Sequence, residues 1–138
     1  MTVIDRFSLK GKVALVTGGA GLYGRQIVRA LAEAGATTYT ASRNVDALES
    51  LAAAHRKEGH DVRALKMDQA DEPSVLAARD AIVQQSGALD VLVNNAVARP
   101  ARDGVFSSAA SIDESMHVNG TGLIVVTRAF GEAMADGG

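Results

Sequence analysis

The chain has 138 residues, 47% hydrophobic and 22% charged, which is the length of one domain and the composition of a protein that buries a core. A net charge of -2 and an aromatic content of 4% argue against a nucleic-acid partner, which needs a basic surface and stacking side chains. The absence of cysteine excludes a disulfide framework, a thiolate metal site and a cysteine nucleophile. No apolar run is long enough to span a bilayer, so we expect no membrane partner and a cytoplasmic protein.

Apolar runs alternate with amphipathic stretches along the chain, and glycines mark most of the boundaries. Short apolar or β-branched runs predict strands over residues 12–16, 37–41, 61–67 and 89–93. Helical spacing predicts helices over residues 22–34, 45–59, 72–87 and about 112–135. The third helix has an acidic N-cap region that begins at Asp68, with Pro73 in its first turn. The long connection over residues 97–111 follows a strand and is expected to be functional.

The apolar stripes of the first three helices predict which side chains face the sheet. They are Leu22, Ile27, Leu31 and Ala34, then Val45, Leu48, Leu51 and Ala52, then Val75, Ala78 and Ile82. The three histidines have no carboxylate or cysteine at ligand spacing, so we expect no metal site. His55 and His60 are expected to face solvent, and His117 is expected to be an ordinary helix residue.

Strands that alternate with helices require right-handed βαβ crossovers, which build a parallel sheet covered by helices on both faces. The pattern predicts an α/β fold, the first half of a doubly wound, Rossmann-type sheet with four strands in the order 3-2-1-4 and four helices. In such a sheet, ligand binds outside the carboxyl ends of the strands, beside the first strand. The fourth strand would be an apolar edge strand and its following helix would be partly uncovered. We therefore expect a homo-oligomer formed through these two elements.

Three glycines, Gly18, Gly21 and Gly24, fall between the first predicted strand and the first predicted helix. A diphosphate can approach the N–H groups of a helix N-terminus only where no Cβ intervenes, and the helix dipole favours the anion. We predict a cofactor-binding loop in which Gly18 allows the turn, Gly21 the close approach of the diphosphate, and Gly24 the contact between helix and strand. Leu22 and Tyr23 of this loop are counted with the binding residues. The alternative is that the glycines only punctuate a strand-to-helix turn.

Ser42 and Arg43 follow the second predicted strand, at the position that reads the ribose of a dinucleotide. A carboxylate there would accept hydrogen bonds from a 2′-hydroxyl and repel a 2′-phosphate, whereas a hydroxyl and a guanidinium suit the phosphate. We therefore expect NADP(H) to be preferred over NAD(H). The alternative is that Arg43 is a solvated residue near Asp46 and carries no information about the cofactor.

Four motifs fall in an order and approximate spacing that resemble the short-chain dehydrogenase/reductase family. They are Thr17 with the three glycines, Asp68 after the third strand, Asn94-Asn95-Ala96 after the fourth, and Asn119 in the last helix. The resemblance extends from Leu9 to Gly138 and covers the cofactor-binding half of a family member. It implies an NAD(P)-binding domain over residues 1–138 that acts in hydride transfer between NADP(H) and a small carbonyl or alcohol substrate.

The resemblance also implies roles for individual residues. Asp68 would bond the adenine, with Gln69 beside it in the cofactor site, and Asn95 and Ala96 would lie along the adenosine ribose. Asn119 would be the first member of a catalytic Asn-Ser-Tyr-Lys tetrad. Without the family, Asp68 is equally a helix-capping or turn residue, Asn94-Asn95 a turn, and Asn119 a polar residue within a helix.

The sequence departs from the family pattern at two positions. Leu22 stands where the family usually has its middle glycine, and Val97 stands where glycine usually follows Asn94-Asn95-Ala96. A β-branched residue allows fewer backbone conformations than glycine beside the cofactor. Gly120 and Gly122 are unusual inside a helix, where each costs about 1 kcal/mol relative to alanine, so we expect close packing or a helix distortion there.

The family's proton donor is a tyrosine with a lysine four residues later. The two tyrosines here, Tyr23 and Tyr39, are followed at that spacing by Ile27 and Arg43. We therefore expect the catalytic half of the family to be absent from this sequence, either because the reductase is truncated or incomplete or because the fragment works with another polypeptide. Two functions stay open: an NADP(H)-dependent oxidoreductase, and a non-catalytic nucleotide-binding or scaffold fragment that needs a complementing chain.

Overall fold

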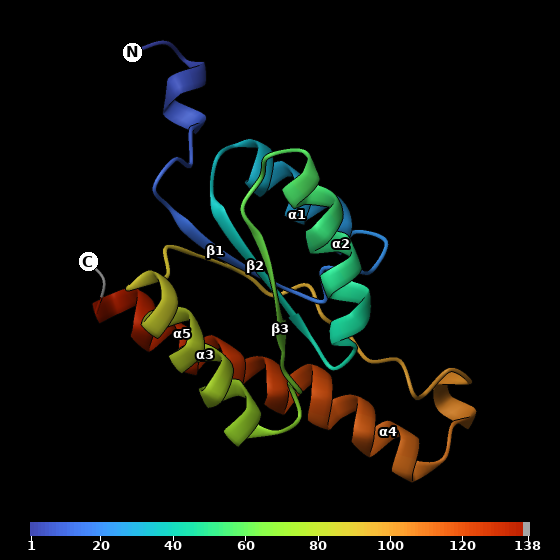
Figure 1. Ribbon diagram of the computed structural model, residues 1–138. Helices are drawn as coiled ribbons and strands as arrows, with labels where there is room; N and C mark the ends of the chain where they lie inside the picture. The colour runs from blue at the N-terminus through green and yellow to red at the C-terminus, as the bar shows by residue number, and fades with distance from the viewer. Residues whose placement is uncertain (137–138) are drawn as a thin grey trace.

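A computed structural model describes residues 1–136, which form one sheet with helices on either side (Figure 1). A short 3-10 helix, Ile4–Phe7, precedes the first strand. The strands are β1 (Val13–Thr17), β2 (Thr37–Ser42), β3 (Val62–Lys66) and β4 (Val91–Val93). The helices are α1 (Gly24–Glu33), α2 (Val45–Lys57), α3 (Glu72–Ser86), α4 (Ala109–Met116) and α5 (Leu123–Asp136). A π-helical segment, His117–Gly122, joins α4 to α5, and a 3-10 turn, Gly104–Phe106, lies in the connection before α4.

The sheet is parallel, with the strand order β3-β2-β1-β4, which confirms the predicted topology. β1 lies between β2 and β4, pairing Val13 with Thr37 and Ala14 with Val91. Every residue of β1 is buried, as expected for a central strand with helices on both faces. Within the described residues, β4 pairs with β1 alone, and the association predicted through this edge stays a prediction.

Two apolar clusters, one on each face of the sheet, join the layers. On one face, α1 and α2 contribute Val28 and Ala52, which pack with Val16 and Val62 of the sheet. On the other face, α3 and α5 pack on each other and on the sheet through larger side chains, including Leu15, Tyr39, Ile82 and Phe130. Burial of these side chains is the main favourable contribution to folding, about 25 cal/mol for each Å² of apolar surface removed from water.

The inner faces of α1 and α2 differ from prediction. Leu22 lies before α1 and is 77% exposed, so it does not belong to the inner stripe. The predicted Ile27 and Leu31 are half-buried against this face, and its buried side chains, Val28 and Ala32, were not predicted. His55 is buried, not solvent-facing, because it continues the inner face of α2 one turn beyond Ala52. The predicted cap of α3 is confirmed: Asp71 accepts a hydrogen bond from the N–H of Ser74, and a proline lies in the first turn.

The last helix is not the single α-helix that was predicted. It begins earlier, at Ala109, where the Ser108 side chain caps it, and it widens into the π-helical segment before α5. The distortion expected at the glycines is confirmed, and Gly122 accounts for the close packing, because a Cβ there would lie 2.6 Å from the carbonyl oxygen of Gln69. A Cβ at Gly120 would meet nothing within 4 Å. Among residues 1–136, no helix is both long and apolar enough to cross a membrane.

Candidate functional site

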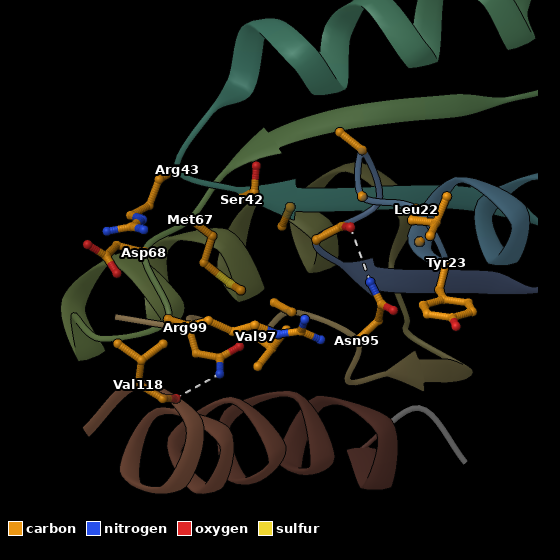
Figure 2. A pocket seen from close by; sticks show the side chains of 17 residues that line it. Leu22, Tyr23, Ser42, Arg43, Met67, Asp68, Asn95, Val97, Arg99 and Val118 are labelled. Carbon is orange, nitrogen blue, oxygen red and sulfur yellow. Dashed lines mark hydrogen bonds between the residues drawn. The ribbon is translucent and has the colours of Figure 1, made fainter. Parts of the chain in front are cut away.

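A cavity of about 520 Å³ opens at the carboxyl edge of the sheet, where all four strands end (Figure 2). This volume lies within the range of small-molecule and cofactor sites. All eleven residues predicted to bind the cofactor line it: Gly18, Gly21, Leu22, Tyr23, Gly24, Ser42, Arg43, Asp68, Gln69, Asn95 and Ala96. Segments far apart in the sequence thus converge on one site, as the parallel topology requires.

The glycine loop is shaped mainly by the packing of the chain itself. Gly18 has a φ of +69°, and a Cβ there would lie 3.0 Å from the Cα of Ala96. A Cβ at Gly24 would clash with the carbonyl oxygen of Gly18 and lie 2.8 Å from the Asn95 amide. Gly19, which was not singled out in the sequence, is also confined, since a Cβ there would clash with the side chain of Thr40.

Gly21 differs from these three glycines. Its φ lies outside the left-handed region, and the nearest atom to an added Cβ is the carbonyl oxygen of Gly18 at 3.4 Å. The fold of the chain therefore does not need glycine at this position. A missing side chain in front of a helix N-terminus leaves room for an anion to approach the backbone. The glycine loop before α1 therefore fits a dinucleotide diphosphate.

Thr17 and Asn95 fasten the glycine loop to the end of β4. The Thr17 hydroxyl accepts hydrogen bonds from the N–H groups of Asn95 and Ala96, at 3.0 and 2.9 Å. The Asn95 amide donates to the carbonyl oxygens of Thr17 and Gly18, at 3.0 and 3.1 Å. Asn95 therefore lines the cavity, and its side-chain amide joins the end of β4 to the glycine loop.

The outer end of the cavity carries charge of both signs. Arg43 follows β2 and Asp68 follows β3, and in the view of Figure 2 both lie on the same side of the cavity. Arg43 is exposed and has no ion pair with Asp46. The Asp68 carboxylate accepts a hydrogen bond from the N–H of Ala70 at 2.9 Å, as a turn residue would, and still borders the cavity.

Gln69 and Asn119 connect the π-helical segment to the site. The Gln69 amide is buried and donates to the carbonyl oxygen of Val118 at 2.9 Å (Figure 2). Asn119 does not line the cavity. Its side chain accepts from the N–H of Ala98 at 2.9 Å and donates to the carbonyl oxygen of the same residue at 2.6 Å. Asn119 thus binds both backbone polar groups of Ala98, in the loop after β4. Its catalytic role stays a prediction.

The sequence did not single out several residues that the structure brings to the cavity. They are Ala20, Ala41, Met67, Arg99 and Val118. Ala41 lies in β2 and Met67 follows β3, so their place at the carboxyl ends of strands could have indicated the site. Val118 and Arg99 carry no such signal, because one lies within a distorted helix and the other in an irregular loop. Val97, noted as a departure from the family pattern, also lines the cavity.

Comparison with known proteins finds extensive similarity. A model of the short chain dehydrogenase family matches residues 12–138. The D-threitol dehydrogenase of Mycolicibacterium smegmatis is 38% identical over 135 residues, which are 96% of this chain and 51% of that protein.

Solved structures of related proteins are also similar to this chain. The gluconate 5-dehydrogenase from Burkholderia cenocepacia, in complex with NADP and tartrate, is 36% identical with a TM-score of 0.83, covering 95% of this chain and 51% of that one. A short-chain type dehydrogenase/reductase from Mycobacterium marinum is 29% identical with a TM-score of 0.92, covering 99% and 56%. The chain therefore spans about half the length of these relatives.

Proposed function

Because this chain belongs to the short chain dehydrogenase family, we propose that it forms the cofactor-binding half of an oxidoreductase that transfers hydride between NADP(H) and a carbonyl or alcohol substrate. The observation that carries the proposal is the convergence of the eleven predicted cofactor-binding residues on one cavity at the carboxyl edge of the sheet. The bound nicotinamide would supply or accept the hydride. Residues 1–138 would form one NAD(P)-binding domain.

The cavity offers a separate group for each part of the dinucleotide. The glycine loop and the N-terminus of α1 would hold the diphosphate, because Gly21 leaves the backbone open. Asp68 and Gln69 would lie beside the adenine, and Asn95 and Ala96 along its ribose. This division assigns a role to each strand end that borders the cavity.

Arg43 supports a preference for NADP(H). It stands after β2, and its guanidinium has no ion pair among the side chains of residues 1–135. Neither Ser42 nor Arg43 repels a 2′-phosphate as a carboxylate would. The gluconate 5-dehydrogenase that resembles this chain was crystallised with NADP. These two observations together support the proposed preference for the phosphorylated cofactor.

Neither tyrosine of the chain is suited to proton transfer at the cavity. Tyr39 is fully buried in the core, where its hydroxyl accepts a hydrogen bond from Arg63 at 2.9 Å and lies 2.7 Å from the Ser86 hydroxyl. Tyr23 borders the cavity, but Ile27 occupies the position of the family's lysine four residues later. We therefore assign cofactor binding, and not proton exchange with the substrate, to residues 1–138.

Equilibrium titration of the purified chain with NADPH and with NADH tests the proposal. We expect binding of both, with a lower Kd for NADPH, measured by calorimetry or by the fluorescence of the reduced nicotinamide. If neither dinucleotide binds to a folded sample at millimolar concentration, the proposed function is wrong. Equal affinities would leave the oxidoreductase assignment in place and remove the preference for NADP(H).

A further inference from the structure

Arg99 is a charged side chain in the cavity to which none of the sequence motifs assigns a role. It follows β4 by six residues and lines the same cavity as the glycine loop. Among the side chains of residues 1–135, its guanidinium has no ion-pair or hydrogen-bond partner. In the view of Figure 2, the Arg99 guanidinium lies on the side of the cavity where Asn95 is. A cation in this place is available to a ligand.

The backbone that carries Arg99 is held on both sides. Ala98, the residue before it, exchanges two hydrogen bonds with the Asn119 side chain, at 2.9 and 2.6 Å. Pro100, the residue after it, restricts the backbone of Arg99 to extended conformations. Because its Cα position is constrained before any ligand arrives, Arg99 would lose less conformational entropy on binding than an arginine in a free loop.

The N-terminus of α1 gives the glycine loop a partial positive charge, and the loop itself carries no cationic side chain. The segment 17–24 contains no lysine or arginine, and the next residue, Arg25, donates to the carbonyl oxygen of Ala20 at 3.0 Å. A helix N-terminus contributes roughly half an elementary charge, whereas a diphosphate carries more negative charge than that. A guanidinium on the opposite wall would supply the remaining complementarity and can bind two phosphate oxygens at once.

We propose that Arg99 binds the cofactor diphosphate from the side opposite the glycine loop, so that the anion lies between its guanidinium and the N-terminus of α1. This inference rests on the proposed function. The two arginines of the cavity then have different targets. Arg43 follows β2 and would serve the 2′-phosphate, whereas Arg99 points toward the side of Asn95, which is hydrogen-bonded to Gly18. Its contact would be common to NADP(H) and NAD(H).

The test compares the variants Arg99→Gln and Arg102→Gln. Arg102 lies in the same loop, is exposed and does not line the cavity, so it matches Arg99 in charge but not in position. We expect Arg99→Gln to weaken NADPH, NADH and ADP-ribose by a similar factor of about ten, and Arg102→Gln to leave all three unchanged. Arg99→Lys should recover part of the loss. Circular dichroism and thermal unfolding check that each variant is folded, which is expected because the Arg99 side chain has no ion-pair or hydrogen-bond partner in the described part of the chain.

The other outcomes separate the inference from its premise. If wild type binds the dinucleotides and Arg99→Gln binds them equally well, Arg99 does not contact the diphosphate and is left for the substrate. A loss confined to NADPH would also overturn the inference, because it would place Arg99 on the 2′-phosphate. Failure of the wild-type chain to bind any of the three ligands would overturn both the inference and the proposed function.

Discussion

The two ends of the sheet differ in whether their charged side chains are paired within the protein. At the amino ends of the strands, charges are paired within the protein. Lys12 forms an ion pair with Asp90 at 2.8 Å, and the other carboxylate oxygen of Asp90 accepts from the N–H of Val13 at 2.8 Å, joining the starts of β1 and β4. Asp61, before β3, is bonded by Arg63 and by Thr37 of β2. Hydrogen bonds from Lys12 and Arg63 hold the pKa of Asp90 and of Asp61, respectively, below the ordinary value.

At the carboxyl ends, the cavity has two arginines without an ion pair among the described residues, Arg43 and Arg99. Pairing a charge inside the protein lets it contribute to folding, whereas leaving it free keeps it available for a ligand at no large desolvation cost, because both side chains are exposed. The contrast teaches that changes at the amino ends should alter stability, and changes at the carboxyl ends should alter binding. Each prediction below tests one side of this division.

The largest expected effect is a complete absence of turnover. The purified chain should bind NADPH without reducing a small ketone, because the proposed cofactor site at the carboxyl ends of the strands has no tyrosine–lysine pair. The measurement is NADPH absorbance over time in a preparation of verified 14.2 kDa mass. Steady oxidation that depends on the ketone would contradict the proposal that residues 1–138 bind the cofactor but do not exchange a proton with the substrate.

The next effect separates two glycines of the same loop. Gly21→Val should abolish binding of both cofactors while the helical circular-dichroism signal stays near that of wild type, because the fold tolerates a Cβ at this position. Gly24→Ala should instead lower the free energy of unfolding by about 1–3 kcal/mol, because its Cβ would meet the backbone of Gly18. Unchanged NADPH affinity in a folded Gly21→Val variant would show that Gly21 serves only the turn.

Arg43→Ala should reduce NADPH affinity by about 1.5–3 kcal/mol, and toward the lower value if the contact stays solvated. NADH affinity and the unfolding temperature should not change, because Arg43 has no ion pair with any side chain of residues 1–135. Titrations of both cofactors in wild type and variant provide the comparison. Equal NADPH affinities in the two proteins would remove the assignment of the 2′-phosphate to the end of β2.

The smallest effect is expected at the amino ends. Asp90→Asn should lower the free energy of unfolding by about 1 kcal/mol at neutral pH, since the Lys12 side chain is exposed and its ion pair is screened. Cofactor affinity should stay the same. Loss of affinity without loss of stability would reverse the proposed contrast between the two ends.

The same variant has a predicted pH dependence. The pKa of Asp90 is lowered in the folded chain, so its contribution is present above the unfolded value of about 4 and is lost as pH falls through the folded value. The difference in unfolding free energy between wild type and Asp90→Asn should therefore shrink as the pH falls below about 4. Denaturant unfolding at a series of pH values measures this difference.

The strand order and most of the site follow from the sequence because they depend on local signals. Apolar runs, glycines at strand ends and the cap at Asp71 are each visible within a few residues, and the parallel topology brings the strand ends together. The place of Arg99 in the cavity could not be predicted, because no periodic sequence pattern indicates the direction of a long side chain in an irregular loop. The two bonds between Asn119 and Ala98 depend on tertiary packing between a helix and a loop. His55 was wrongly placed because its polar character outweighed its position on the inner face of α2.

The π-helical segment determines how α5 is rotated about its axis relative to α4. An α-helix turns about 100° per residue, and a π-helical turn accommodates one extra residue. Deletion of a single residue between His117 and Gly122 would therefore leave a regular α-helix through this segment. It would rotate α5 relative to α4 by about that angle. Val126 and Phe130, both fully buried against the sheet, would turn away from it. The extra residue thus determines which face of α5 packs against the sheet, and Asn119, which binds Ala98, lies in the same segment.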